Sequence, residues 1–402
     1  MWILFKIINI WWLLTATYVW IMALLPMPGL LVLANASMII CFSFLPVKFH
    51  FDAKLGWIIL AIVLLTLWST WIDGWINGIM TMLQYTPVLL LVQLPYEYQK
   101  DLLKFVTKWY AILLSPGLLL YWILLFKPLT SFGTFVHPVY MPYTNYIFFL
   151  KTTAPIGTFE RFNAFFLEPG HQALVSTFLM MANKFDFRKC PWLIVLALGV
   201  IFSFSLAGYL LSITGFLLLK VNSLTKALAS LGAIAVIGVG AYMWSGGDNA
   251  LNEMIISRLE YDESSGIKGN NRFFDNTDFE YERALKSQYF WIGVKTKANM
   301  KLISGAGYKI YILNYGMIGV LLAMFFYLTV IPARPDYRYT ISFLIVLTLC
   351  FLQRAYPFWY SWLFSYVVGI YVAKGERTYA TTESETEHEY SEREASYNRQ
   401  IE

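Results

Sequence analysis

Long apolar runs alternate with short polar segments along most of this chain. A helix needs roughly 20 mostly apolar residues to cross a bilayer, so the pattern predicts about twelve membrane-spanning helices. They are expected near residues 3–25, 28–47, 55–72, 75–94, 103–126, 170–184, 191–206, 207–220, 227–243, 309–331, 339–353 and 357–373. Two of the boundaries between neighbouring spans depend on turn-forming residues, at 26–29 and at 205–208. The expected fold is therefore an all-α polytopic membrane protein.

Basic residues collect in alternate connections between these runs, as the positive-inside rule requires of cytoplasmic loops. The residues concerned are Lys48, Lys54, Lys100, Lys104, Lys184, Arg188, Lys189, Lys220, Lys226, Arg334 and Arg338. This distribution predicts that both termini are cytoplasmic and that two long segments, 127–169 and 244–308, face outward. We expect residues 1–373 to form a single transmembrane domain. The polar tail 374–402 has no apolar periodicity and is expected to be disordered in the cytoplasm.

The composition supports a membrane protein and narrows the kinds of chemistry that the chain could perform. The chain has 402 residues, of which 58% are hydrophobic and only 14% charged, whereas about a quarter of the residues of a soluble domain are charged. Acids and bases nearly balance in 244–308, which argues against nucleic-acid binding. The sequence shows no metal-binding spacing, no nucleotide-binding glycine loop and no Asp-x-Asp pair, so we expect neither a metal nor a cofactor. Charge within the spans is scarce, which argues against an ion-coupled carrier.

The most distinctive polar stretch lies between Gly157 and Met180. Within it, the triplet 168–170 (Glu-Pro-Gly) is typical of a helix start, because proline suits the first helical position and an acid is favoured there. If a helix begins at this proline, Glu168, His171 and Gln172 are expected to project from one face of its first turn. Arg161 approaches from the preceding segment. The cluster could hold an anion and move a proton, although the same residues also suit a plain helix cap beside an interfacial arginine.

Three further segments carry candidate residues, and each also has a simpler structural explanation. Arg272 follows a turn-prone Gly-Asn-Asn and would be presented from a loop. Gly305 and Gly307 precede Lys309 and Tyr311 at the entry to a span, where glycines allow close backbone approach and helix N–H groups can receive phosphate oxygens. A flexible connection would explain the same glycines. Ser203 and Ser205 lie in a turn whose small residues also suit close helix packing.

A final candidate is Arg354, which lies in an expected outward turn beside several aromatic residues. It could bind substrate, or it could serve as an interfacial anchor.

The order of these motifs resembles that of the O-antigen polymerase (Wzy-type) family and its O-antigen ligase relatives. The resemblance rests on the string Arg-x-x-small-x-Phe-x-Glu-Pro-Gly-x-x-Ala at 161–173, on Ser-x-Ser-x-x-Gly at 203–208, and on an arginine with Gly-x-Gly, here Arg272 and 305–307. It covers about residues 155–325. The glycine often found three residues after the motif arginine is Ala164 here. The segment 244–308 contains no histidine, which favours a polymerase over a ligase.

The resemblance implies a glycosyltransferase of GT-C-like architecture in the bacterial cytoplasmic (inner) membrane, with its active site facing the exterior or periplasm. Such an enzyme transfers a growing polysaccharide from undecaprenyl pyrophosphate to a hydroxyl of the next lipid-linked repeat unit, in O-antigen, capsule or exopolysaccharide synthesis. It needs neither metal nor nucleotide. Its implied partners are the lipid-linked oligosaccharide, membrane lipids and a chain-length regulator of the Wzz type. The alternatives are an O-antigen-type ligase and, least favoured because the spans carry little charge, a flippase.

The resemblance also assigns roles to individual residues. Arg161 and Arg272 would stabilise the departing pyrophosphate, with Gly305 and Gly307 contributing backbone donors. Glu168 would be the general base, and His171 its helper or replacement. The remaining candidates for substrate binding are Gly170, Gln172, Ser203, Ser205, Lys309, Tyr311 and Arg354. A helix start and a nearby arginine both favour the ionised carboxylate and weaken it as a base, so orienting the acceptor or an arginine is a competing role for Glu168.

Overall fold

The structure is a computed structural model that describes residues 1–15, 19–23, 27–136, 142–152, 160–221, 275–294, 306–354 and 359–378, with a few isolated positions and two short strands between them. Most of these residues are helical. The helices are α1 (Trp2–Thr15), α2 (Trp20–Ala23), α3 (Met27–Ser43), α4 (Ala53–Asp73), α5 (Trp75–Leu91), α6 (Tyr96–Phe126), α7 (Pro169–Ala182), α8 (Leu193–Phe202), α9 (Leu206–Lys220), α11 (Asp275–Leu285), α12 (Tyr289–Ile292), α13 (Gly307–Val330) and α14 (Tyr337–Gln353). Residues 360–378 form a further helix.

Helices α4, α6 and α13 are long and apolar enough to cross a membrane; several other apolar helices are shorter. The outward face of α4 is itself apolar, with Trp57 55% exposed and Leu67 60% exposed. In water this face would be costly, since burial of apolar surface is the main force that stabilises folds. The chain is thus a helical membrane protein, and the number of its spans stays a prediction.

The helices lie where the apolar runs predicted them. Every expected span contains a helix, apart from 227–243, which is outside the described residues. The predicted division near residue 205 is confirmed: α8 ends at Phe202 and α9 begins at Leu206, with the Ser205 side chain accepting a hydrogen bond from Gly208 N. The expected outward segment 244–308 also contains two helices, α11 and α12.

The first helix is shorter than predicted, because its run continues apolar to residue 25 but α1 ends at Thr15. The backbone beyond it is used for pairing with a distant segment. Val19 forms an antiparallel bridge with Phe166, and Trp20 N donates to the Phe165 carbonyl oxygen at 3.1 Å. Since a helical backbone cannot make these hydrogen bonds, the helix ends before them.

The segment 127–169 contains a small antiparallel sheet of strands β1 (Thr134–Phe135), β2 (Tyr143–Asn145) and β3 (Leu150–Thr152), in the order β1-β2-β3. In its register, Tyr143 is opposite Thr152 and Asn145 is opposite Leu150. A second pair of strands, β4 (Tyr261–Asp262) and β5 (Gly266–Ile267), forms a hairpin. The sheet fixes the segment that leads into α7.

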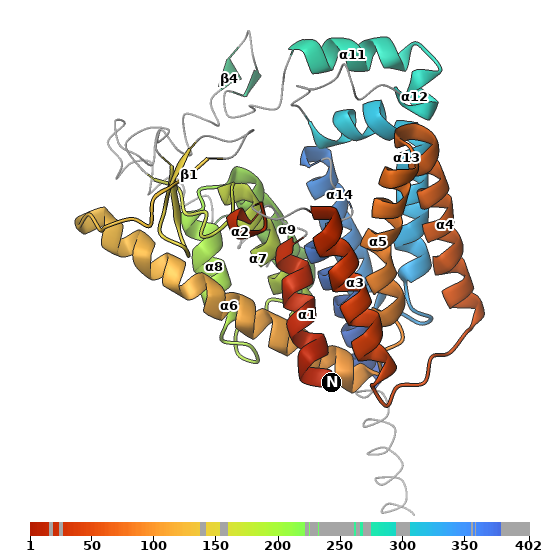
Figure 1. Cartoon of the computed structure of the whole chain (residues 1–402), viewed down its shortest axis with the longest axis horizontal. Helices are drawn as coiled ribbons and strands as arrows, with labels where there is room; N and C mark the ends of the chain where they lie inside the picture. The colour runs from red at the N-terminus through yellow and green to blue at the C-terminus, as the bar shows by residue number, and fades with distance from the viewer. Residues whose placement is uncertain are drawn as a thin grey trace, which may run out of the picture.

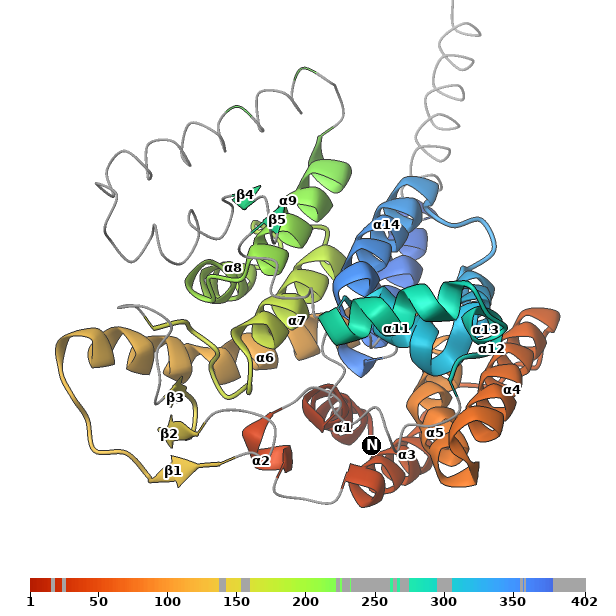
Figure 2. The same ribbon diagram turned by 90° about the horizontal axis from the view of Figure 1, so that it is seen from above.

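Helices α1, α3, α4, α5, α13 and α14 run side by side, whereas α6 is inclined to them (Figure 1). Helix α9 packs against α14, and α7 packs against α8 and α9. Seen from above, α11 and α12 cross the end of the bundle at which α13 begins (Figure 2). The helix 360–378 runs through the interior and continues past residue 374, where the tail was expected to start. There Glu376 binds Lys184 at 2.7 Å, which explains why the helix continues.

Candidate functional site

The segment that carries the arginine of the motif, residues 160–168, is held against the turn between α8 and α9. Arg161 Nε donates to the Ser203 carbonyl oxygen at 3.0 Å, and Phe162 N donates to the Phe202 carbonyl oxygen at 2.8 Å. These bonds bring the first two motifs of the sequence together. Ser203 contributes its backbone carbonyl here, while its Oγ donates to the Val200 carbonyl oxygen at 2.6 Å.

The other side of this segment is bound to the outer sheet. Leu150 N donates to the Ala164 carbonyl oxygen at 2.8 Å, and the Tyr143 hydroxyl donates to the Leu167 carbonyl oxygen. Burial, and secondarily the negative charge of Glu168, raise the pKa of Tyr143 to about 12. The phenol therefore stays protonated and keeps donating over the whole physiological range. Fixed on both sides, the segment delivers Glu168 to one defined place.

Glu168 is the N-cap residue of α7, and its side chain makes no capping hydrogen bond to the helix. Its Oε2 instead lies 2.7 Å from Arg354 Nη2. The side chains are 28% exposed for Glu168 and 10% exposed for Arg354, so the pair is largely withdrawn from solvent. The Glu168 side chain thus pairs with Arg354 instead of capping α7, and Arg354 is directed inward rather than anchored at an interface.

His171 joins this pair from the first turn of α7. Its Nε2 lies 3.4 Å from Glu168 Oε2, and its side chain is only 1% exposed. The Trp359 ring packs edge-on against the imidazole, with the ring centroids 4.8 Å apart. Contact between Glu168 and His171 across one turn was predicted from their spacing and is confirmed.

The start of α7 and the end of α14 stabilise the charges of the Glu168–Arg354 pair. Glu168 precedes the first turn of α7, and Arg354 follows the last residue of α14, with its N–H bonded to the Cys350 carbonyl oxygen at 2.8 Å. A helix carries partial positive charge at its N-terminus and partial negative charge at its C-terminus. The α7 end therefore stabilises the carboxylate, and the α14 end stabilises the guanidinium.

Two glycines of the sequence motifs make room for Arg354. A Cβ built on Gly170 would lie 2.7 Å from Arg354 Nη2 and 3.6 Å from Ser205 Oγ. A Cβ on Gly307 would collide with the backbone N and C atoms of Arg354. Close approach of backbone thus explains Gly307, and Gly170 leaves room for the end of the Arg354 side chain. Gly170 and Gly307 lie against Arg354, and Ser205 lies beside Gly170.

Lys309 and Tyr311, which follow Gly307 on α13, have different surroundings. Lys309 Nζ binds Asp278 Oδ1 of α11 at 2.7 Å and lies 5.5 Å from the ring centroid of Tyr281. These contacts hold α11 across the start of α13. Tyr311 is 5% exposed and packs against aromatic rings of the core, so the structure places it in the interior rather than with the polar group at Arg354.

Gln172 was expected on the same face as Glu168 and His171, and this prediction is wrong. Its side chain is fully buried, and its Nε2 donates to Ser176 Oγ at 2.9 Å. It fills the space beside Gly199 of α8, where a Cβ would collide with it. A residue directly after His171 is turned by about 100° around the helix axis, which directs Gln172 into the contact between α7 and α8.

The predicted site residues Arg272 and Gly305 lie outside the described residues.

The sequence did not single out Asp278, Trp359 or Tyr143. Asp278 is the partner of Lys309, Trp359 contacts His171, and Tyr143 is hydrogen-bonded beside Glu168. Trp359 could have been predicted from the sequence, because an aromatic residue so close to Arg354 along the chain is a natural neighbour of the same site. The other two come from outer segments whose pairing cannot be read from hydrophobic periodicity.

Chemically, the arrangement joins a half-buried carboxylate, a buried imidazole and a buried guanidinium at one end of the helical bundle. It can bind an anion through Arg354 and accept a proton at Glu168 or His171. Comparison of the chain with protein-family models, with curated proteins and with solved structures finds no match to any of them.

Proposed function

We propose that this protein is a polysaccharide polymerase. It transfers a growing glycan from undecaprenyl pyrophosphate to the next lipid-linked repeat unit, at the outer face of a bacterial cytoplasmic membrane, with both termini inside. The observation that carries the proposal is the ion pair of Glu168 with Arg354 at 2.7 Å, which lies against Gly170 and Gly307 of the sequence motifs.

In the proposed reaction, a hydroxyl oxygen of the acceptor sugar attacks the anomeric carbon of the donor. The bond from that carbon to the pyrophosphate oxygen breaks, and its electron pair leaves with the pyrophosphate. The hydroxyl proton passes to a protein base. The donor supplies its own activation, so the protein has to stabilise negative charge on the leaving group and accept one proton.

Arg354 takes the pyrophosphate-binding role beside Arg161 in this proposal. Guanidinium groups bind phosphate oxygens through paired, charge-assisted hydrogen bonds. Arg354 is 10% exposed at its side chain, which strengthens such bonds because the surroundings screen charge less than water does. The sequence alone had favoured Arg272 for this role, together with Arg161.

Glu168 and His171 are the candidates for the base. An arginine at 2.7 Å and a helix N-terminus both favour the ionised form of Glu168, which makes it available but weak. His171, with Nε2 3.4 Å away, can share the proton with it. The two side chains act together as an acceptor in this mechanism, with the carboxylate orienting the imidazole.

The test compares surface and lipid-linked glycans from cells that contain or lack this protein. If its loss reduces a ladder to single repeat units that still reach their final anchor, the proposal is supported. If long polymer instead remains on the lipid carrier, the protein is a ligase, and unchanged glycans would refute both activities.

Point variants locate the chemistry within the protein. Arg161→Ala, Glu168→Ala and Arg354→Ala are each expected to abolish polymer while the protein remains in the membrane. Lys189→Gln is the matched control, since the Lys189 side chain is 79% exposed in a distant connection. Wild-type polymer from the three site variants would remove this site from the mechanism.

A further inference from the structure

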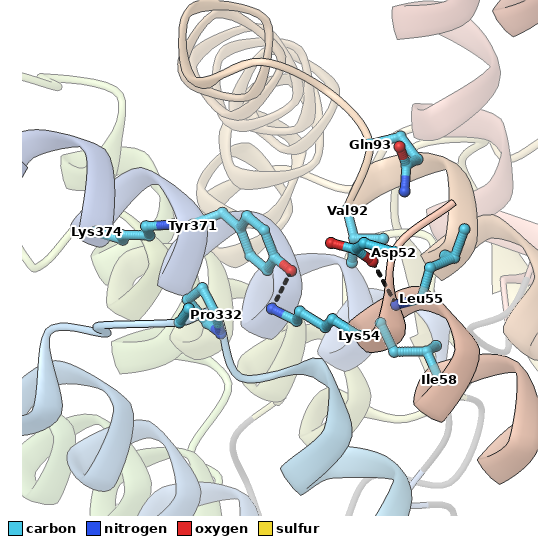
Figure 3. A pocket seen from close by; sticks show the side chains of 10 residues that line it. Asp52, Lys54, Leu55, Ile58, Val92, Gln93, Pro332, Tyr371 and Lys374 are labelled. Carbon is cyan, nitrogen blue, oxygen red and sulfur yellow. Dashed lines mark hydrogen bonds between the residues drawn. The ribbon is translucent and has the colours of Figure 1, made fainter. Parts of the chain in front are cut away.

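A second polar site lies at the opposite end of the helical bundle from Glu168. It is a cavity of about 180 Å³ where α4 begins, α5 ends and α13 ends, closed on one side by the helix 360–378 (Figure 3). Helix α13 runs from the Arg354 site to this cavity, a separation on the order of 30 Å. The cavity is therefore unrelated to the chemistry proposed above.

Two lysines from different helices line this cavity. Lys54 Nζ donates to the Tyr371 hydroxyl oxygen at 2.5 Å and lies 4.6 Å from the centroid of the same ring (Figure 3). Lys374 follows Tyr371 by three residues, which places both on one face of the helix 360–378. Both lysine side chains are half-buried and line the same cavity.

The carboxylates near the cavity have partners of their own. Asp52 lines the cavity, and its Oδ1 accepts the N–H of Leu55 at 2.8 Å as the cap of α4. Glu376 Oε2 binds Lys184 at 2.7 Å. Within the part of the chain that the structure describes, neither Lys54 nor Lys374 forms a salt bridge. The cavity thus brings two lysines and one carboxylate together, with the basic groups in excess.

The remaining polar groups add hydrogen-bond donors. Tyr371 accepts from Lys54 and so keeps its own O–H for donation. The side-chain oxygen of Gln93 accepts the N–H of His50 at 2.9 Å, which leaves its NH₂ group as the donor. Two ammonium groups, a phenol and an amide on one cavity are a donor set for an anion with several acceptor oxygens.

We propose that this cavity binds a phosphate group, held between Lys54 and Lys374 with Tyr371 and Gln93 as additional donors. Lysine binds phosphate as a point charge, and the two lysines outnumber the single carboxylate, Asp52, on this cavity. The cavity lies at the ends of the long apolar helices α4 and α13, where a membrane protein meets the headgroup layer. The phosphate can accordingly come from an anionic phospholipid headgroup or from free phosphate.

The experiment uses the purified full chain in a neutral detergent and follows its Tm by tryptophan fluorescence. One arm adds sodium phosphate against sodium chloride at equal ionic strength. The other adds short-chain phosphatidylglycerol against short-chain phosphatidylcholine. A ligand that binds the folded state raises Tm with its concentration, and the dependence gives an apparent affinity. A response to phosphatidylglycerol alone identifies the lipid as the source, a response to phosphate alone identifies the free ion, and a response to both shows that the phosphate group suffices.

Variants show whether the response belongs to this cavity. Lys54→Gln and Lys374→Gln are expected to weaken the apparent affinity roughly 10- to 100-fold, as the loss of a charge-assisted hydrogen bond would. Lys54→Arg should keep most of it. Lys48→Gln is the matched control, because Lys48 is exposed on the same end of the bundle and does not line the cavity. If Lys54→Gln does not fold, Lys374→Gln decides alone.

Two results would overturn the proposal. One is that neither phosphate nor phosphatidylglycerol raises the Tm of the wild-type protein above its salt or lipid control. The other is that Lys54→Gln and Lys374→Gln respond as strongly as the wild-type protein does, which would assign the effect to general surface charge.

Discussion

The Glu168–Arg354 pair allows a quantitative test of the site that does not depend on activity. At 2.7 Å, the attraction between two unit charges is about 1.5 kcal/mol in a water-like medium and about 6 kcal/mol at an effective dielectric constant of 20. The side chains, 28% and 10% exposed, lie between these limits. We expect a double-mutant cycle of Glu168→Gln and Arg354→Gln to give a coupling free energy of about 2 kcal/mol.

The single variants should differ in a defined order. Glu168→Gln leaves the more buried charge, Arg354, without its carboxylate, and we expect it to lower the free energy of unfolding by about 3 kcal/mol. Arg354→Gln leaves Glu168, which is more exposed and still has His171 at 3.4 Å, so a loss of about 2 kcal/mol is expected. The measurement is unfolding in mixed micelles by sodium dodecyl sulfate, followed by tryptophan fluorescence.

A second ion pair supplies the control for this cycle. Lys309 and Asp278 are similarly shielded, with side chains 14% and 26% exposed, and form an ion pair of their own. Asp278→Asn combined with Glu168→Gln should therefore be additive to within about 0.5 kcal/mol. A coupling below about 0.5 kcal/mol between Glu168 and Arg354, or a larger loss for Arg354→Gln than for Glu168→Gln, would refute the reasoning.

Three further predictions concern the surroundings of the pair. Gly307→Ala puts a Cβ against the Arg354 backbone and should lower Tm and abolish the coupling between Glu168 and Arg354 in the same cycle; an unchanged coupling would show that the glycine is not needed. Ala164 has a φ of 49° and is fully buried, so Ala164→Val should cost about 3 kcal/mol of unfolding free energy in the same micelle assay, whereas Ala164→Gly should be close to neutral. Burial raises the pKa of Glu160 despite the opposing charge of a nearby lysine, so the folded state binds its proton more tightly than the unfolded state does. Relative to Glu160→Gln, the wild-type protein should therefore lose stability as the pH rises from the ordinary carboxyl pKa through the raised one, and equal Tm profiles from pH 4 to pH 7 would contradict this.

Hydrophobic run length was sufficient to place the helices, because each run either reaches the length of a span or is interrupted by a turn signal. The start of α7 at Pro169 and the division before Leu206 both followed from local chemistry. The early end of α1 did not, because it depends on pairing of Val19 with Phe166, a distant partner. Local patterns show which residues favour a helix. They do not show which residues will instead form backbone hydrogen bonds with a segment distant in sequence.

The candidate site likewise combines features that local sequence predicts with features that depend on contacts between distant segments. Glu168, His171 and Arg354 were all identified from the sequence, and the one-turn contact between the first two followed from helix geometry. The pairing of Glu168 with Arg354 did not, since it joins the start of α7 to the end of α14. The error over Gln172 arose because spacing along a helix gives the angle between side chains, while the packing of α7 on α8 decides which angle faces the site.

The pair also constrains how the proposed reaction would proceed. Arg354 holds Glu168 at 2.7 Å with its Nη2, so a pyrophosphate oxygen would first meet the remaining N–H donors of the same guanidinium. An arriving pyrophosphate, with more negative charge than a single carboxylate, would compete for the guanidinium and draw it from Glu168. The carboxylate would then lose the partner that most weakens it as a base, and His171 would become its nearest ionisable neighbour. On the proposed function, donor binding would thus prepare the base, so that a proton is taken from an acceptor hydroxyl only when a glycan is ready to be transferred.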